Sequence, residues 1–197
     1  MRKRLTLTTI LVTLLAGTAL AADTFEIDQA HSYIGFSVKH MVIATVKGNF
    51  TDFAGTIVFD STDLSKSSVN VTIKTASIST DNTRRDDHLR SADFFDAANS
   101  PEITFVSESI TKTDNGYLAK GKFTMRGVTK EIELPFEILG VITGSDGSAK
   151  MGVDVAPITV NRQEYGLKWS KLTETGGLVA SDDVKIEIHL ELNKKMK

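Results

Sequence analysis

The chain has 197 residues, and its 23 Lys and Arg residues are nearly balanced by 25 Asp and Glu residues. This slightly acidic balance argues against a nucleic-acid-binding protein, which would need a basic surface for phosphates. The sequence contains no cysteine, which excludes disulfides, thiol catalysis, iron–sulfur clusters and zinc sites built from thiolates. The stability of the fold must therefore come from burial of apolar side chains and from backbone hydrogen bonds.

The first 21 residues have the three-part pattern of a secretory signal peptide. Basic residues at positions 2–4 precede an apolar run over residues 5–20, and small residues at its end predict cleavage after Ala21. The alternative is an uncleaved membrane anchor, but the run is shorter than the roughly 20 apolar residues that a span needs. We expect a single domain over residues 22–197, periplasmic or secreted, with no membrane span after cleavage.

Period-two alternation of apolar and polar residues dominates the rest of the chain, which is typical of half-buried β-strands. Each strand then has one apolar and one polar face, because successive side chains point to opposite sides of a sheet. In chain order the alternating segments are 32–40, 55–59, 68–75, 103–105, 116–125, 130–140, 150–157 and 183–192. Turn residues such as Arg126 and Gly127 separate the later segments. About eight such strands favour an antiparallel β-barrel, with a β-sandwich as the alternative.

The alternation is interrupted once, where we expect a short helical insertion over about residues 81–100. Thr83 and Asp86 have the spacing of a capping pair at the start of a helix. Pro101 ends the insertion, because a proline disfavours helical geometry in the residue before it. The large apolar residues of this stretch, which we expect to pack against the barrel, are Leu89, Phe94 and Phe95.

A charged cluster in this insertion, Arg85, Asp86 and His88, resembles a general acid–base set. A carboxylate can orient a histidine, and histidine titrates near neutrality. The chain has, however, no nucleophile motif of the type Gly-x-Ser-x-Gly and no His-Glu-x-x-His motif. A salt-bridged loop that acts as a scaffold or a ligand gate is the simpler interpretation. We therefore predict no catalytic residue.

The four histidines are far apart in the sequence and form no i, i+4 pair, so we predict no metal site. A site built from His31, His40 and His88 with an aspartate is an alternative that the spacing does not support. His40 lies on the apolar face of its strand and is either a core histidine or a polar contact near a cavity mouth. Arg162 follows a strand-like segment at the expected barrel rim, where it would recognise an anionic group or pair with Glu164.

Several motifs together resemble the YceI-like family of exported polyisoprenoid-binding proteins. The similarity extends over residues 28–192, with the motifs in the right order. They are DQAHSYIGFSVKH (28–40), GNFTDFAGTI (48–57), TRRDDHLRSADFFD (83–96) with SPEITF (100–105), MRGVTKEIELPFEI (125–138) and NRQEYGL (161–167). The resemblance implies a lipocalin-like, eight-stranded antiparallel barrel that is periplasmic or secreted and often a homodimer.

The resemblance also implies that the chain binds and carries, or sequesters, a long polyisoprenoid or similar amphiphilic lipid, without a cofactor. An eight-stranded barrel has an interior just wide enough for side chains or for one slender ligand. The side chains expected in the lumen are Ile34, Phe36, Val38, His40, Phe105, Phe123, Met125, Leu134, Phe136 and Ile188. Those expected at the mouth or head group are Arg85, His88 and Arg162.

Two alternatives to a lipid carrier stay open. The chain is either an enzyme that acts on an isoprenoid lipid through the Arg85, Asp86 and His88 cluster, or a structural stress-response barrel without a ligand. The small residues Ala119 and Gly121 argue against a barrel filled by its own side chains, because they are expected to leave room in the lumen.

Overall fold

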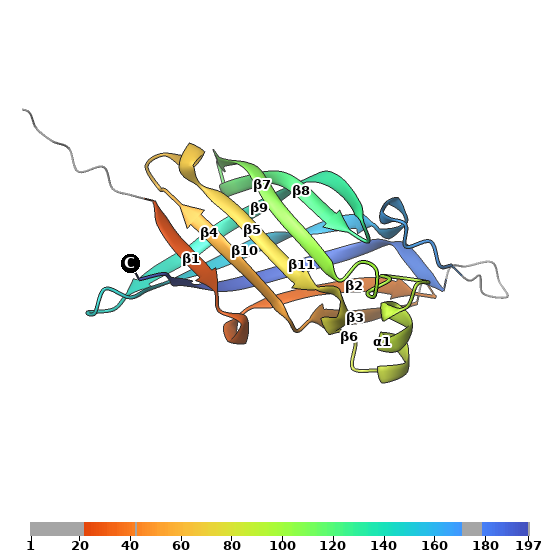
Figure 1. The fold of residues 1–197 in the computed structure, drawn as a ribbon. Coiled ribbons are helices and arrows are strands. Elements are labelled where there is room, and N and C mark those ends of the chain that lie inside the picture. Colours follow the sequence, from red (N-terminus) through yellow and green to blue (C-terminus); the bar gives the residue numbers. More distant parts are fainter. Residues whose placement is uncertain (1–21, 42, 171–178, 197) are drawn as a thin grey trace, which may run out of the picture.

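The predicted strands are present in the computed structural model, which describes residues 22–41, 43–170 and 179–196 (Figure 1). The strands are β1 (Asp23–Ile27), β2 (Tyr33–His40), β3 (Ala44–Phe50), β4 (Phe53–Phe59), β5 (Ser68–Lys74), β6 (Ile78–Ser79), β7 (Glu102–Thr113), β8 (Gly116–Met125), β9 (Val128–Thr143), β10 (Ala149–Asn161) and β11 (Ala180–Lys194). The helix α1 (Thr83–Arg90) lies between β6 and β7, and short 3-10 helices cover 29–31, 64–66, 75–77 and 162–165. No helix in the described ranges combines the length and the apolarity needed to cross a bilayer. The predicted signal peptide, residues 1–21, lies outside the described residues.

One antiparallel sheet contains all of these strands, and it closes on itself. Its order is β1-β4-β5-β7-β8-β9-β10-β11-β2-β3-β6, with an additional pairing between β1 and β11. Strand β11 pairs with β10 along one edge, and along the other edge with β2 and then with β1. β1 and β2 are therefore two halves of one barrel strand, as are β3 with β4 and β5 with β6. The result is an eight-stranded antiparallel barrel, which confirms the predicted fold class and excludes the sandwich.

The three halved strands break at neighbouring points. These breaks, which together we call the waist, are residues 28–32, 51–52 and 75–77. The backbone N–H and the hydroxyl of Thr51 both donate to the carbonyl of Ser77, each at 3.2 Å. The side-chain amide of Gln29 donates to the carbonyl of Thr51. Because the breaks are hydrogen-bonded to one another, three barrel strands are interrupted together, and the waist divides the barrel into two ends.

The two ends differ in how they are filled. We call one end the open end: strands β2, β8 and β10 finish there, and strands β3, β7, β9 and β11 begin there. We call the opposite end the closed end. Tyr117 and Phe136 stack toward the closed end with ring centroids 5.3 Å apart, and Phe59 packs edge-on against Tyr117 at 5.6 Å. Apolar clusters occupy the same region, formed by Phe25, Ile57, Met151, Val153 and Leu192, and by Phe105, Ile110 and Ala119.

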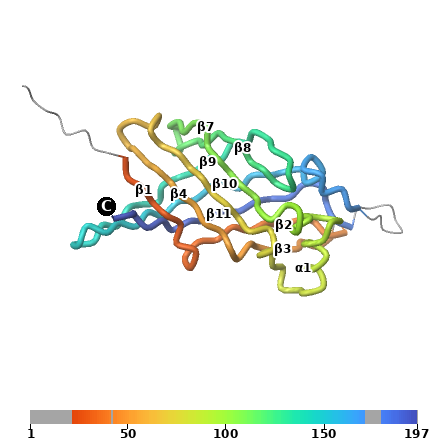
Figure 2. The backbone as a smooth tube through the Cα atoms, in the orientation of Figure 1, coloured from red at the N-terminus to blue at the C-terminus, as the bar shows by residue number. Residues whose placement is uncertain are grey.

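Residues 80–101, which we call the covering segment, lie at the open end beside the gap between β6 and β7. Strand β7 is hydrogen-bonded to β5 and β8, whereas β6 pairs with β3, so the segment lies where the sheet has no continuous pairing (Figure 2). Phe94 is buried, and Leu89 and Phe95 pack against the same apolar cluster. The Phe95 ring lies edge-on to Phe50 at 6.0 Å. The predicted packing of this insertion against the barrel is thus confirmed.

The helix of the covering segment begins differently from the prediction. Asn82 is the N-cap, and its side-chain oxygen accepts a hydrogen bond from the N–H of Arg85 at 3.0 Å. The expected capping pair of Thr83 with Asp86 is wrong. Asp86 is buried and instead accepts hydrogen bonds from the backbone N–H and the hydroxyl of Thr80. This carboxylate therefore fixes α1 to the end of β6.

The expectation that Ala119 and Gly121 leave room in the lumen is also wrong. Ala119 is packed in the cluster with Phe105 and Ile110. Gly121 accommodates the neighbouring strand, because a Cβ atom built on it would lie 2.3 Å from the carbonyl oxygen of Val106. The register between β7 and β8 shifts directly after this point. The glycine is needed for close backbone approach at an irregular strand pairing, not for ligand volume.

We expect Gly121→Ala to destabilise the barrel by about 1–3 kcal/mol, since either the new methyl group or the β7 backbone must move. For a domain of this size this corresponds to a melting temperature lower by about 2–4 °C per kcal/mol, measured by circular dichroism. Gly140→Ala in β9 is the matched control, because its Cβ would meet nothing within 4 Å. Equal melting temperatures for the two variants would contradict the close approach.

The first break of the waist is held by a polar cluster. The carboxylate of Asp28 accepts hydrogen bonds from the ring of His31 at 3.0 Å and from the side-chain amide of Asn193 at 3.2 Å. The hydroxyl of Ser32 accepts from the N–H of Glu191 at 3.0 Å and donates to its carbonyl at 3.3 Å. The hydrogen bond from His31 is the largest cause that lowers the pKa of Asp28 to about 2. These residues therefore anchor the crossing from β1 to β2 on β11.

The stabilising effect of Asp28 should depend on pH. A carboxyl group whose pKa is lower in the folded than in the unfolded state stabilises the fold above its unfolded pKa of about 3.9. This contribution is lost as the pH falls through the folded pKa of about 2. The melting temperature of Asp28→Asn should therefore lie below that of the wild type at pH 7, and the difference should shrink between about pH 4 and pH 2. Asp114→Asn, in the β7–β8 turn, controls for the loss of one exposed carboxylate; a pH-independent difference for Asp28→Asn would refute the proposed coupling.

Candidate ligand-binding cavity

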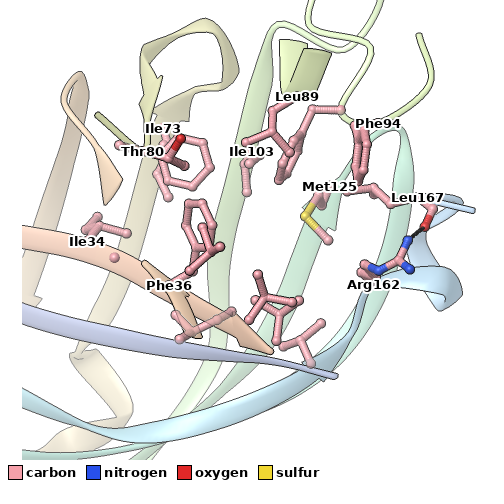
Figure 3. A pocket seen from close by; sticks show the side chains of 18 of the residues that line it. Ile34, Phe36, Ile73, Thr80, Leu89, Phe94, Ile103, Met125, Arg162 and Leu167 are labelled. Carbon is pink, nitrogen blue, oxygen red and sulfur yellow. Dashed lines mark hydrogen bonds between the residues drawn. The ribbon is translucent and has the colours of Figure 1, made fainter. Parts of the chain in front are cut away.

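A cavity of about 630 Å³ occupies the open end of the barrel. This volume lies within the range of about 300–1,000 Å³ that is usual for small-molecule sites. The cavity reaches the surface, because the exposed residues Lys39, Asn82 and Arg84 contribute to its lining. Apolar side chains from the strands and from the covering segment face one another across it, among them Ile34, Phe36, Ile73, Leu89, Phe94, Ile103 and Met125 (Figure 3).

The structure brings together almost all of the side chains that the sequence assigns to the lumen. Phe136 is the exception, since it stacks on Tyr117 toward the closed end. His40, the last residue of β2, is half-buried and lies near the exposed rim of the cavity. The lining includes Ile34, Phe36, Val38, His40, Phe105, Phe123, Met125, Leu134 and Ile188.

Other lining residues come from segments in which alternation gives no signal. Leu167 and Trp169 follow β10 and the last 3-10 helix, and both contribute to the cavity wall. The ring of Trp169 lies 5.1 Å from that of Phe94 in the covering segment. The motif at 161–167 indicated only a position at the barrel rim, because irregular backbone has no fixed relation between residue spacing and side-chain direction. The two irregular segments thus complete the wall together.

Arg85, Asp86 and His88 do not converge on a common point. Arg85 donates from Nε to the hydroxyl of Thr80 at 2.7 Å and from Nη2 to its carbonyl at 2.8 Å. The buried Asp86 accepts from the same hydroxyl and from the backbone N–H of Thr80. His88 is paired with Asp93 at 3.2 Å instead. Two of the three side chains therefore brace the start of the covering segment, as the scaffold interpretation expects.

His88 belongs to an aromatic contact at the cavity wall. Its ring lies edge-on to Phe94 at 5.0 Å and edge-on to Trp169 at 5.3 Å. Asp93 contacts Nε2 from the same segment. This arrangement links the covering segment to the chain that follows β10, and it leaves His88 at the border of the cavity.

Arg162 is buried and all five of its N–H groups are hydrogen-bonded within the chain. Nε donates to the carbonyl of Ser181 at 2.9 Å, and Nη2 donates to the carboxylate of Asp182 at 2.9 Å. Its other acceptors are the carbonyls of Leu167, Trp169 and Ala180. Burial lowers the pKa of the guanidinium, and the charge of Asp182 opposes that shift. Since a guanidinium has five donors, none remains for a ligand head group, and we do not include Arg162 in the proposed head-group contacts.

The histidines considered for a metal site are also separated. His31 lies at the waist, where its ring nitrogen and oxygens of Asp28 and Glu191 lie within 4.8 Å of one another. Lys150 approaches Glu191 there at 2.5 Å, so this group is part of an ion-pair network. His40 and His88, in contrast, line the cavity.

Arg162→Lys should destabilise the open end, because lysine offers three donors instead of five and lacks the planar geometry. We expect a loss of about 2–4 kcal/mol in the free energy of unfolding, since buried carbonyl groups lose their partners. Chemical denaturation at pH 7 measures this quantity. Arg84→Lys, at an exposed position, is the matched control and should change the free energy by less than about 0.5 kcal/mol. If the two variants unfolded alike, the buried network would not stabilise the fold.

Comparisons with known proteins agree with this architecture. A family model described as the YceI-like domain matches residues 25–192. A UPF0312 protein of Staphylococcus aureus is 36% identical over 170 residues, which cover 86% of this chain and 96% of the relative. A YceI protein of Campylobacter jejuni, whose crystal structure is known, is 38% identical, with a TM-score of 0.68 and coverage of 86% of this chain and 97% of that one.

Two more distant structures share the fold. BcnA of Burkholderia cenocepacia has a TM-score of 0.72 at 24% identity, with coverage of 84% of this chain and 98% of that one. A polyisoprenoid binding domain of Saccharophagus degradans has a TM-score of 0.63 at 15% identity, with coverage of 87% and 98%. The family model, with its match over nearly the whole barrel, carries the assignment. The chain is a member of the YceI-like family, as its motifs predict.

Proposed function

We propose that the protein binds a long-chain polyisoprenoid, or a similar amphiphilic lipid, in the cavity and carries or sequesters it. The observation that carries this proposal is an apolar cavity of about 630 Å³ that reaches the surface at the open end of the barrel. If a methylene-sized group needs about the 30 Å³ that a water molecule takes in the liquid, this volume accommodates roughly 20 carbon atoms. An extended chain of four five-carbon units has that size.

The affinity of such a ligand would come from burial of its tail. Each buried methylene-sized group contributes about 0.8 kcal/mol, so a five-carbon unit contributes up to about 3–4 kcal/mol before the cost of ordering the chain. Two or three buried units are then sufficient for tight binding. The specificity of the lumen would be for a slender apolar shape, and the head group would be recognised at the open end.

Membership of the YceI-like family supports a binding role, and so does the polyisoprenoid binding domain that shares the fold. The signal-peptide pattern supports a periplasmic or secreted location. An enzymatic role has less support, because Asp86 is hydrogen-bonded to Thr80 and does not orient His88. A purely structural barrel has less support because the described side chains leave a cavity of about 630 Å³ open between them. A homodimer stays a prediction.

The first test is to purify the protein under native conditions, extract it, and identify any bound lipid by mass spectrometry. The second uses geranylgeraniol, a neutral prenyl alcohol of 20 carbon atoms. Ile188→Trp, which adds bulk inside the cavity, should weaken binding at least tenfold. Val106→Trp introduces the same side chain at a position that is 45% exposed and should leave the affinity unchanged. Thermal melts establish that both variants are folded.

Equal affinity of the two tryptophan variants for geranylgeraniol would place the ligand outside the cavity. A protein that carries no lipid after native purification and binds no prenyl alcohol would refute the proposal. Turnover of a bound prenyl lipid that disappears in His88→Ala would instead establish the enzymatic alternative.

A further inference from the structure

The ionisable side chains that line the cavity are all basic. They are Lys39, His40, Arg84, Arg85, His88 and Arg162, and the described lining contains no aspartate or glutamate. The chain as a whole has more acidic than basic residues, 25 against 23. The sign of the charge around the cavity is therefore opposite to that of the whole protein. The basic side chains gather at its open end, on the last residues of β2, in the covering segment and after β10.

Three of these six groups are already occupied by contacts within the chain. Arg162 uses all five donors, and His88 is paired with Asp93. Arg85 uses two of its donors on Thr80. These contacts explain why Arg162, His88 and Arg85 are at the rim. They do not explain the other basic residues of the lining.

Arg84 and Lys39 are the lysine and arginine side chains of the lining that the fold uses least. Both are exposed and line the cavity. Within the described part of the chain, Arg84 has no side-chain hydrogen bond and no ion pair. Lys39 has one hydrogen bond, to the hydroxyl of Thr45 at 3.1 Å. If the rim only kept the opening in contact with water, acidic side chains would serve there as well as basic ones. The absence of aspartate and glutamate from the described lining therefore needs another explanation.

The carboxylates of α1 do not neutralise Arg84. Asp86 is buried against Thr80. Asp87 is paired with Arg90 at 3.2 Å, and that arginine in turn donates to the carbonyls of Ala76 and Ile78. Both carboxylates of α1 are thus engaged with partners other than Arg84.

Resting on the proposed function, we infer that the lipid in this cavity has an anionic head group, a carboxylate or a phosphate. Arg84 and Lys39 bind the head from the two sides of the opening, with the remaining donors of Arg85 between them and the cavity wall. The tail lies in the apolar interior. An arginine suits this role, because its planar fork matches the two oxygens of a carboxylate or phosphate. The head stays close to water, so neither charge has to be fully desolvated on binding.

The test compares ligands that share one tail and differ only in the head. Geranylgeranyl phosphate, geranylgeraniol and geranylgeranylamine are titrated into the purified, delipidated protein. We expect the phosphate to bind about tenfold more tightly than the alcohol, as for one or two charge-assisted hydrogen bonds at a partly exposed site. The amine should bind no better than the alcohol. The preference for the phosphate should decrease as salt is added, because exposed charges are screened.

Variants at the rim assign this preference to residues. Arg84→Gln combined with Lys39→Gln should bring the ratio of phosphate to alcohol affinity close to one, whereas Arg84→Lys, which keeps the charge, should retain part of it. Lys112→Gln, which removes a positive charge from the far part of β7, is the matched control and should keep the tenfold ratio. Inorganic phosphate alone should not displace the lipid, since it lacks the tail.

Two negative results are distinguishable. If the alcohol binds and the phosphate binds no better, the anionic head group is refuted while the proposed lipid-binding function survives. If neither ligand binds, the proposed function fails as well. A double variant that is folded and keeps the tenfold preference would also overturn the assignment to Arg84 and Lys39.

Discussion

The architecture depends on one constraint, the joint interruption of three neighbouring strands at the waist. An eight-stranded barrel with continuous strands has an interior that side chains can fill completely. Thr51, in the break between β3 and β4, donates to the carbonyl of Ser77 in the break between β5 and β6. It also accepts from the side chain of Gln29 in the break between β1 and β2. The polar cluster around Asp28 fixes the same line on β11. The strand segments of the closed end can therefore pack as an ordinary apolar core, while those of the open end are positioned independently and enclose a cavity.

The open end lacks part of the sheet, and arginine side chains replace the missing backbone pairing. Arg90 donates to carbonyls before α1, and Arg126 bridges the carbonyls of Ala92 and Gly166. Arg162 does the same for the chain on both sides of residues 171–178. A buried carbonyl outside regular structure needs a donor, and a guanidinium offers five of them in fixed directions. The charged motif in the covering segment is thus largely a scaffold that holds irregular backbone.

Period-two alternation favoured the barrel over a sandwich and predicted most of the side chains that line the lumen, because each strand exposes one face to the interior. It could not predict where along a strand the interior is filled. Phe136 has the same alternation as Leu134, yet it lies beyond the cavity and stacks on Tyr117. Similarly, the small side chain of Gly121 serves the β7 backbone and not the ligand volume. Both differences depend on contacts between strands that are distant in sequence.

The contacts of irregular segments do not follow from residue spacing either. The spacing of Thr83 and Asp86 matches a capping pair, but Thr80 offers two donors to the same carboxylate, and this tertiary contact prevailed over the local one. Arg162 was expected at the rim from its motif, which is where it lies. Its burial and its five partners were not predictable, because the partners are four backbone carbonyls and the carboxylate of Asp182, which lie after β10 and at the start of β11.

The placement of polar bonds at the rim follows from the function that the cavity would serve. Each apolar side chain added inside the open end would stabilise the fold by burial, but it would also take volume from the ligand. Bonds made around the opening, such as those of Arg126 and Arg162, stabilise the same end without occupying its interior. The atoms that line the hollow lack packing partners until a ligand supplies them, so a bound tail should stabilise the folded state as well. Fold stability and ligand binding are in this way coupled at the open end and separate at the closed end.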